Sequence, residues 1–69
     1  MTRIEKLRKI LEEHQWAKVE GRMVDVQSAN AYITVYDALK PSNQEDLNAR
    51  NLSSAISICW AILSPRDES

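Results

Sequence analysis

The segment Val19–Pro41, VEGRMVDVQSANAYITVYDALKP, decides the fold because it contains the single glycine of the chain, a helix start and a helix stop. Gly21 can take a positive φ at no steric cost, so the chain turns sharply there, either as a tiny hairpin or as an irregular turn. Asp25 or Ser28 is a good N-cap for the helix that follows. Pro41 ends that helix, because the residue before a proline is pushed out of the α region.

Apolar residues recur at helical spacing in three segments, which predicts an all-α fold. We expect a small bundle of three main helices, near 3–15, 26–40 and 53–63, with one short helix near 43–50 before the last. Residues 1–64 then form a single helical domain. The charged residues 65–69 have nothing to bury, so we expect them to be a disordered tail.

Short polar side chains mark the expected helix starts. Thr2 with Glu5, and Ser42 with Glu45, have the spacing of a capping box, in which each side chain satisfies the other residue's backbone N–H. A serine at 53–54 is expected to cap the last helix.

The last helix is apolar almost all round, and such a helix belongs inside a structure. It is therefore expected at the centre of the bundle, with apolar residues of the other helices packed around it. The predicted core comprises Leu7, Leu11, Val26, Ile33, Tyr36, Leu39, Leu47, Ile56, Cys59, Trp60 and Leu63.

Large apolar side chains are too many for a monomer of 69 residues to cover. We therefore expect a homodimer with the first or the last helix in the interface, and with Cys59 buried and reduced. The candidate interface residues lie on the flank of the helix 26–40 and on a second apolar row of the last helix: Tyr32, Val35, Ile58 and Ile62.

Charge argues against nucleic acid as a partner. Nine lysines and arginines stand against ten aspartates and glutamates, so the formal net charge is −1, whereas binding through phosphates needs a basic face. Arg3, Lys6, Arg8 and Lys9 are interspersed with glutamates and are interpreted as a solvated helix face. The longest apolar run is far too short to span a bilayer, and the charged N-terminus is unlike a secretory leader, so we expect a cytoplasmic protein.

The sequence contains no pattern typical of an enzyme. One histidine, His14, and one cysteine, Cys59, cannot build a structural zinc site. Asp25 and Asp37 would be separated by ~18 Å along one helix, too far for an acid–base pair. We therefore expect no catalytic residue, no cofactor and no metal.

One sequence pattern runs through the segment from the glycine turn to the residues after the proline stop. Its positions are Gly21, Val24, Asp25, Ser28, Ala29, Val35, Tyr36, Asp37, Ala38, Leu39, Pro41 and Asn43. By this pattern the chain between Val19 and Leu63 resembles small proteins of unknown function encoded by actinobacterial phages, mycobacteriophages in particular. After the asparagine the similar proteins tend to carry Arg or Lys, whereas this chain has Gln44, Glu45 and Asp46. The resemblance implies a phage origin, but no activity and no site.

Two classes of function fit these observations. The first is a non-enzymatic protein that binds itself or a host protein, with an effect on host growth as one consequence. The alternative is a DNA-binding regulator in which the helices on either side of Pro41 form a helix-turn-helix. In that case Gln44, Asn48 and Arg50 would be the candidate base readers, with a single positive charge among them.

Overall fold

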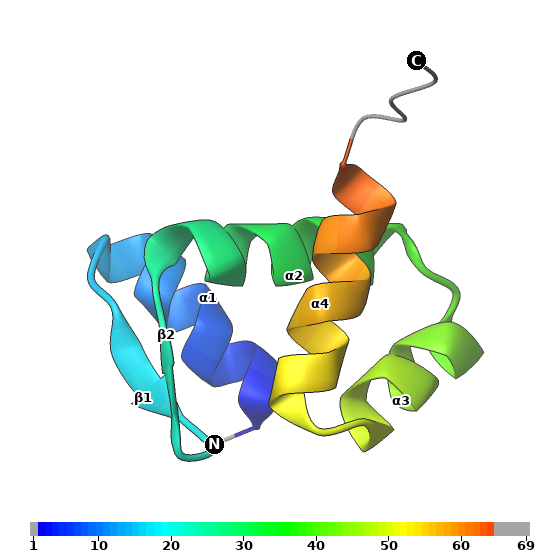
Figure 1. The fold of residues 1–69 in the computed structure, drawn as a ribbon, viewed down its shortest axis with the longest axis horizontal. Helices are drawn as coiled ribbons and strands as arrows, with labels where there is room; N and C mark the ends of the chain where they lie inside the picture. Colours follow the sequence, from blue (N-terminus) through cyan, green and yellow to red (C-terminus); the bar gives the residue numbers. More distant parts are fainter. Residues whose placement is uncertain (1, 65–69) are drawn as a thin grey trace.

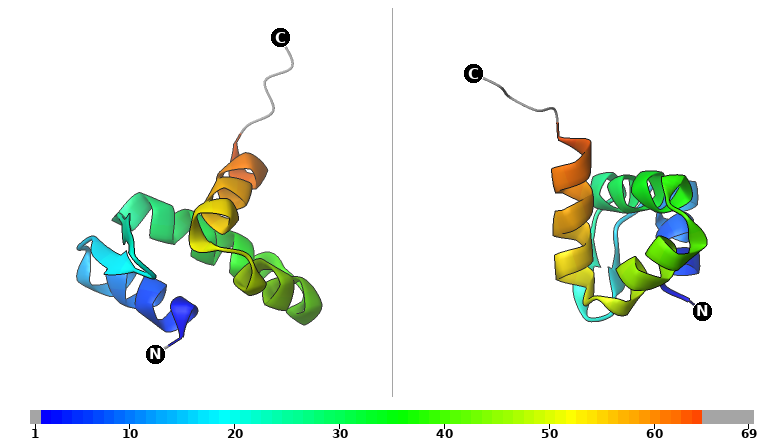
Figure 2. Two further views of the ribbon diagram at one scale, coloured as in Figure 1. Left: turned by 60° about the horizontal axis from the view of Figure 1, so that its bottom comes forward. Right: turned by 90° about the vertical axis from the view of Figure 1, so that its right-hand side faces the viewer.

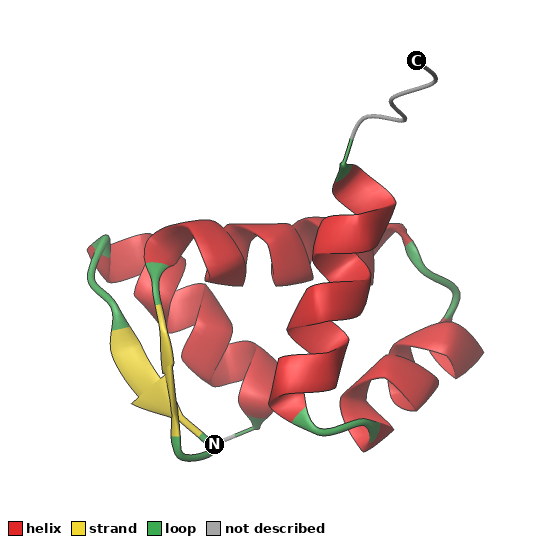
Figure 3. Cartoon of the chain, in the orientation of Figure 1, coloured by secondary structure: helices red, strands yellow, loops and turns green. Residues whose placement is uncertain are grey.

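The computed structural model describes residues 2–64, so the predicted tail at 65–69 lies outside the described residues. Helices dominate, as predicted, but a two-stranded antiparallel sheet is also present, so the all-α prediction was incomplete (Figure 3). Along the chain the elements are α1 (Arg3–Glu13), β1 (Ala17–Val19), β2 (Arg22–Val24), α2 (Val26–Ala38), α3 (Pro41–Ala49) and α4 (Leu52–Leu63) (Figure 1).

The helix α2 organises the fold because it packs against both α1 and α4. The hairpin lies beside α1 at one end of the molecule, and α3 lies at the other end, beside the start of α4 (Figures 1 and 2). The axis of α4 crosses that of α2, and the last turn of α4 extends beyond it (Figure 1). The apolar side chains of this protruding turn are therefore exposed.

The break at Gly21 is a tight hairpin, the first of the two predicted alternatives. Val19 pairs with Arg22 across a turn of two residues, Glu20 and Gly21, whose φ values are 52° and 80°. Positive φ at both central residues is the geometry of the turn that matches the twist of paired strands. Each strand has one buried residue, its last, and these two valines close one side of the core.

The core predicted from helical spacing is confirmed in part. Leu7, Ile33, Leu47, Ile56 and Cys59 are buried, and Leu11, Val26, Tyr36 and Leu39 are partly buried and pack against them. The buried residues that the prediction omitted come from α1, from the hairpin and from the helices α2 and α4: Ile10, Val19, Val24, Ala29, Ala31, Tyr32, Val35, Leu52 and Ala55.

Two predicted core residues were wrong. Trp60 is 42% exposed and Leu63 is 41% exposed. Leu63 continues the helical row of Ile56 and Cys59, which is buried where α4 crosses α2. The last turn of α4 extends past α2 (Figure 1), so that within residues 2–64 the same row is left partly exposed at Leu63.

Two of the helix starts are as predicted. Thr2 and Glu5 form a reciprocal capping box at α1. Asp25 caps α2 by accepting a 2.7 Å hydrogen bond from the backbone N–H of Ser28. That bond stabilises the ionised carboxylate, so the pKa of Asp25 lies below its ordinary value.

The other two helix starts differ from the prediction. The helix α3 begins at Pro41 with no side-chain cap, so the capping box predicted at Ser42 does not form. Proline suits the first helical position because it lacks the N–H that would need a partner. Asn51, not a serine at 53–54, caps α4 by accepting a 2.8 Å hydrogen bond from the backbone N–H of Ser54.

Candidate interaction surfaces

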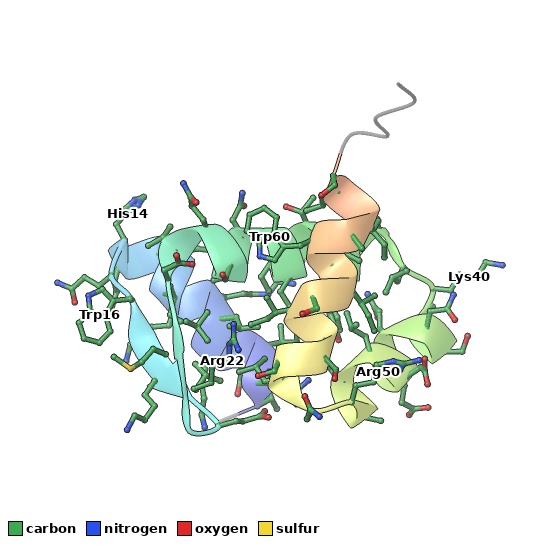
Figure 4. The ribbon with its side chains drawn as sticks, viewed as in Figure 1. His14, Trp16, Arg22, Lys40, Arg50 and Trp60 are labelled. Atoms are coloured by element: carbon green, nitrogen blue, oxygen red, sulfur yellow. The ribbon has the colours of Figure 1, made fainter. Side chains whose placement is uncertain are left out.

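The last turn of α4 carries an exposed apolar surface, which we call the α4 end. It consists of Trp60, Ile62 and Leu63, and Ile62 is 58% exposed. Trp60 lies on the hairpin side of the helix (Figure 4). An α-helix places Ile62 about 160° around the axis from Trp60, so the two side chains cover opposite flanks of the turn.

A shallow hollow of about 160 Å³ lies next to the α4 end, between α2, α3 and α4. Polar side chains of α3 and the residue after it line part of its wall, and the rest is apolar. Three of the four predicted interface residues, Val35, Ile58 and Ile62, line this hollow, together with Leu39, Asn43, Asp46, Leu47 and Arg50.

Tyr32, the fourth predicted interface residue, lies elsewhere and is fully buried. Its hydroxyl donates a 2.6 Å hydrogen bond to Oδ1 of Asn48 and accepts a 3.1 Å hydrogen bond from Nη1 of Arg3. Burial raises the pKa of Tyr32, so the phenol stays protonated at neutral pH. Tyr32 therefore contributes to the interior of the protomer and is not available to a partner.

Arg3 was interpreted as part of a solvated face, but its side chain is only 9% exposed. Its Nε and Nη2 donate hydrogen bonds of 2.7 and 2.6 Å to the two carboxylate oxygens of Glu20, and Nη2 also donates to the carbonyl of Arg50 at 2.9 Å. The bidentate pair raises the pKa of Arg3 and lowers that of Glu20. This cluster, which we call the Arg3 clamp, joins α1 and the hairpin turn to α2 and α3.

A second depression lies between α1 and β1, and we call it the α1–β1 groove. Its volume is about 370 Å³, and it is lined by Lys6, Lys9, Ile10 and Glu13 of α1 and by the segment 15–19. Trp16, which is 63% exposed, lies at its outer end (Figure 4). The sequence patterns did not reveal this groove, because it depends on how the hairpin packs beside α1.

The polar residues considered for chemistry are dispersed. His14 is exposed at the C-terminus of α1, in a left-handed conformation with φ of 56°. Asp37 accepts a 2.8 Å hydrogen bond from Nη2 of Arg8, while Asp25 caps α2. Cys59 is buried, and burial raises the pKa of its thiol. Within residues 2–64, no three His, Cys, Asp or Glu side chains lie close enough together to hold a metal ion.

None of the helices in the described part of the chain has the length and apolar character needed to cross a membrane. No protein-family model, no curated protein and no solved structure matches this chain.

Proposed function

We propose that the protein is a non-enzymatic interaction protein that forms a homodimer through the α4 end and also binds a host protein. The supporting observation is the apolar row of α4, which is buried against α2 and then continues uncovered to Leu63. Exposed apolar surface of this kind is a common mark of an association site. The hollow beside Ile58 and Ile62 gives a second copy a place for an apolar side chain.

Of the two helices considered for the interface, α4 has the better support. On α1, Leu7 and Ile10 are buried, and Ile4 and Leu11 pack against the core. The outer face of α1 carries charged residues, and one of them, Arg8, is paired with Asp37 of α2. A charged face that is already partly paired gains little by losing its water.

The resemblance to actinobacterial phage proteins supports a host protein as the second partner, with the bacterial cytoplasm as the site of action. Inhibition of host growth is one consequence of such binding. Expression of the protein in an actinobacterial host tests this consequence, with the charge-reversed groove variants described below as controls.

Self-association is tested by sedimentation velocity over a range of protein concentrations. We expect the wild-type mass to rise from monomer to dimer in the micromolar range, and we expect Ile62→Asp to remain monomeric with its helical circular dichroism intact. The matched control is Met23→Asp, which places the same charge at an exposed apolar residue of the hairpin and should leave the dimer unchanged. A wild-type protein that is monomeric at every concentration contradicts the proposal.

The alternative, a helix-turn-helix regulator, gains no support from the geometry. The helix that would read the bases is α3, whose exposed residues include Glu45 and Asp46. Arg50, the one positive charge among the candidate base readers, donates a 3.4 Å hydrogen bond to Asp46. An acidic helix next to DNA phosphates is repelled, so we do not propose DNA binding.

A further inference from the structure

We propose that the α1–β1 groove binds an acidic, extended peptide segment of a partner protein. This inference depends on the proposed role in protein–protein interaction but not on self-association. The groove lies at the hairpin end of the molecule, whereas the last turn of α4 extends beyond α2 (Figure 4).

The charges of the groove are available to a partner. Lys6, Lys9 and Lys18 all line it, and none of them forms an ion pair with another of the described residues. Three of the arginines, Arg3, Arg8 and Arg50, differ in this respect because each is paired with a carboxylate. Arg22 and Lys40 also form no ion pair with a described residue, but neither lines the groove. Three unpaired lysines thus gather at one depression, which favours an anionic occupant.

The same groove has an apolar lining and an aromatic end. Ile10 of α1 and Val19 of β1 are buried at the floor of the groove, and Ala17 adds a small apolar side chain to its lining. Trp16 extends into solvent at the outer end. An exposed tryptophan beside an apolar surface is a typical anchor at protein interfaces. The occupant therefore needs large apolar side chains as well as negative charge.

Besides the lysines and the apolar lining, the groove offers the backbone of β1 to a partner. Among the described residues β1 belongs to a sheet of two strands, so one of its edges has no strand of residues 2–64 beside it. Val19 and Arg22 form the hydrogen-bonded pair that closes the turn, so the neighbouring pair, Lys18 with Met23, is not hydrogen-bonded. The N–H and C=O of Lys18 consequently point away from β2, where an extended peptide can pair with them.

A peptide fits this combination better than a nucleic acid does. Glu13 lines the groove together with the lysines, so an unbroken chain of phosphates would meet a carboxylate. An extended peptide alternates its side chains between two faces and can place acidic groups near the lysines and an apolar group against Trp16. It also brings backbone groups to the edge of β1.

The proposal is tested with a short blocked peptide of alternating aspartate and leucine. The protein carries Trp60→Phe, so that Trp16 is its sole tryptophan, and also Ile62→Asp, so that dimerisation cannot influence the signal. We expect the peptide to change the Trp16 emission and to shift the backbone amide resonance of Lys18. A peptide of alternating lysine and leucine should do neither. An analogue methylated at its backbone nitrogens should bind more weakly, because it cannot donate to the strand edge.

Charge-reversed variants locate the site. Lys9→Glu and Lys18→Glu should each weaken binding of the acidic peptide about tenfold, which corresponds to a loss of ~1.4 kcal/mol. The matched control is Lys40→Glu, an exposed lysine at the opposite end of the molecule (Figure 4), which should leave the affinity unchanged. The milder Lys9→Gln and Lys18→Gln repeat the test if a reversed variant loses its helical signal.

Three outcomes overturn the proposal. One is no response to the acidic peptide at millimolar concentration. Another is equal weakening by the control and the groove variants, which would mean that net charge alone matters. The third is binding of an oligothymidylate in place of the peptide, which would assign the groove to single-stranded nucleic acid. Because the dimer is absent from this assay, a failure here leaves the self-association experiment unaffected.

Discussion

Replacement of Tyr32 by Phe isolates the contribution of the Tyr32 hydroxyl, which joins α2 to Arg3 and Asn48. The hydroxyl of Tyr32 is buried and uses both of its capacities, as donor to Asn48 and as acceptor from Arg3. Tyr32→Phe keeps the ring and removes the oxygen, so the Asn48 carbonyl and one guanidinium N–H lose their partner. A buried polar group without a partner costs ~1–3 kcal/mol.

For a domain of this size, 1 kcal/mol shifts the melting temperature by ~4–8 °C, so Tyr32→Phe should lower it by about 4–24 °C. The matched control is Tyr36→Phe on the same helix. The Tyr36 hydroxyl makes no hydrogen bond within residues 2–64, and its residue is only partly buried, so this change should cost less than ~0.5 kcal/mol. The assay is thermal and urea unfolding at one protein concentration, because the proposed dimer would make the midpoint depend on concentration. Equal unfolding midpoints for Tyr32→Phe and Tyr36→Phe would show that the two hydrogen bonds of the Tyr32 hydroxyl do not stabilise the fold.

Three further predictions concern stability. Ile56→Ala removes a fully packed side chain where α4 crosses α2 and should cost ~2–5 kcal/mol in urea unfolding; a midpoint close to that of the parent would contradict this packing. Gly21→Ala meets no neighbouring atom but must keep φ near 80°, so it should cost ~1–2 kcal/mol from backbone strain alone. Arg3 lowers the pKa of Glu20 in the folded state below its ordinary value of 4.5. The ionised Glu20 therefore contributes to the free energy of unfolding above pH 4.5, and this contribution is lost as the pH falls through the lower folded pKa. The free energy of unfolding should be level from pH 7 to about 5 and then decline. The decline should be less steep in Glu20→Gln but not absent, because the pKa of Asp25 is also lowered in the folded state. Identical declines in the parent and the variant would contradict the assignment to Glu20.

Much of the local structure could be predicted from the sequence, because local signals decide it. The observed helix bounds lie within two residues of the predicted ones, since periodic apolar residues, Pro41 and the caps at Thr2 and Asp25 act over a single turn. The hairpin was one of two alternatives. Periodicity could not choose between them, because strands of three residues show too few alternations.

The differences from the prediction arise where tertiary geometry decides. Leu63 lies on the correct side of its helix, but its burial depends on where α4 crosses α2 and on how far α4 continues beyond that crossing (Figure 1). The Arg3 clamp joins residues 17, 29 and 47 positions apart in sequence. No spacing rule connects such distant positions. The only local signal is that Glu20 precedes Gly21 in a tight turn, and this does not indicate which helix the turn packs against.

Tertiary geometry also decides where the four predicted interface residues lie. Val35, Ile58 and Ile62 were chosen because they flank the apolar faces of their helices, and the fold brings them to one hollow. Tyr32 was chosen on the same criterion, but its hydroxyl enters a polar cluster that only the folded chain assembles. A flank position alone does not distinguish a surface residue from one covered by a neighbouring helix.

The central claim is that the α4 end is the contact between two copies of the chain. The most direct measurement is an isotope-filtered nuclear Overhauser experiment on a mixture of labelled and unlabelled protein, which detects only contacts between copies. We predict intermolecular signals from the methyl groups of Ile62 and Leu63 to residues lining the hollow, Ile58 and Val35 among them. Intermolecular signals confined to Trp16 and Met23, or none at concentrations where sedimentation gives a dimer mass, would contradict the claim.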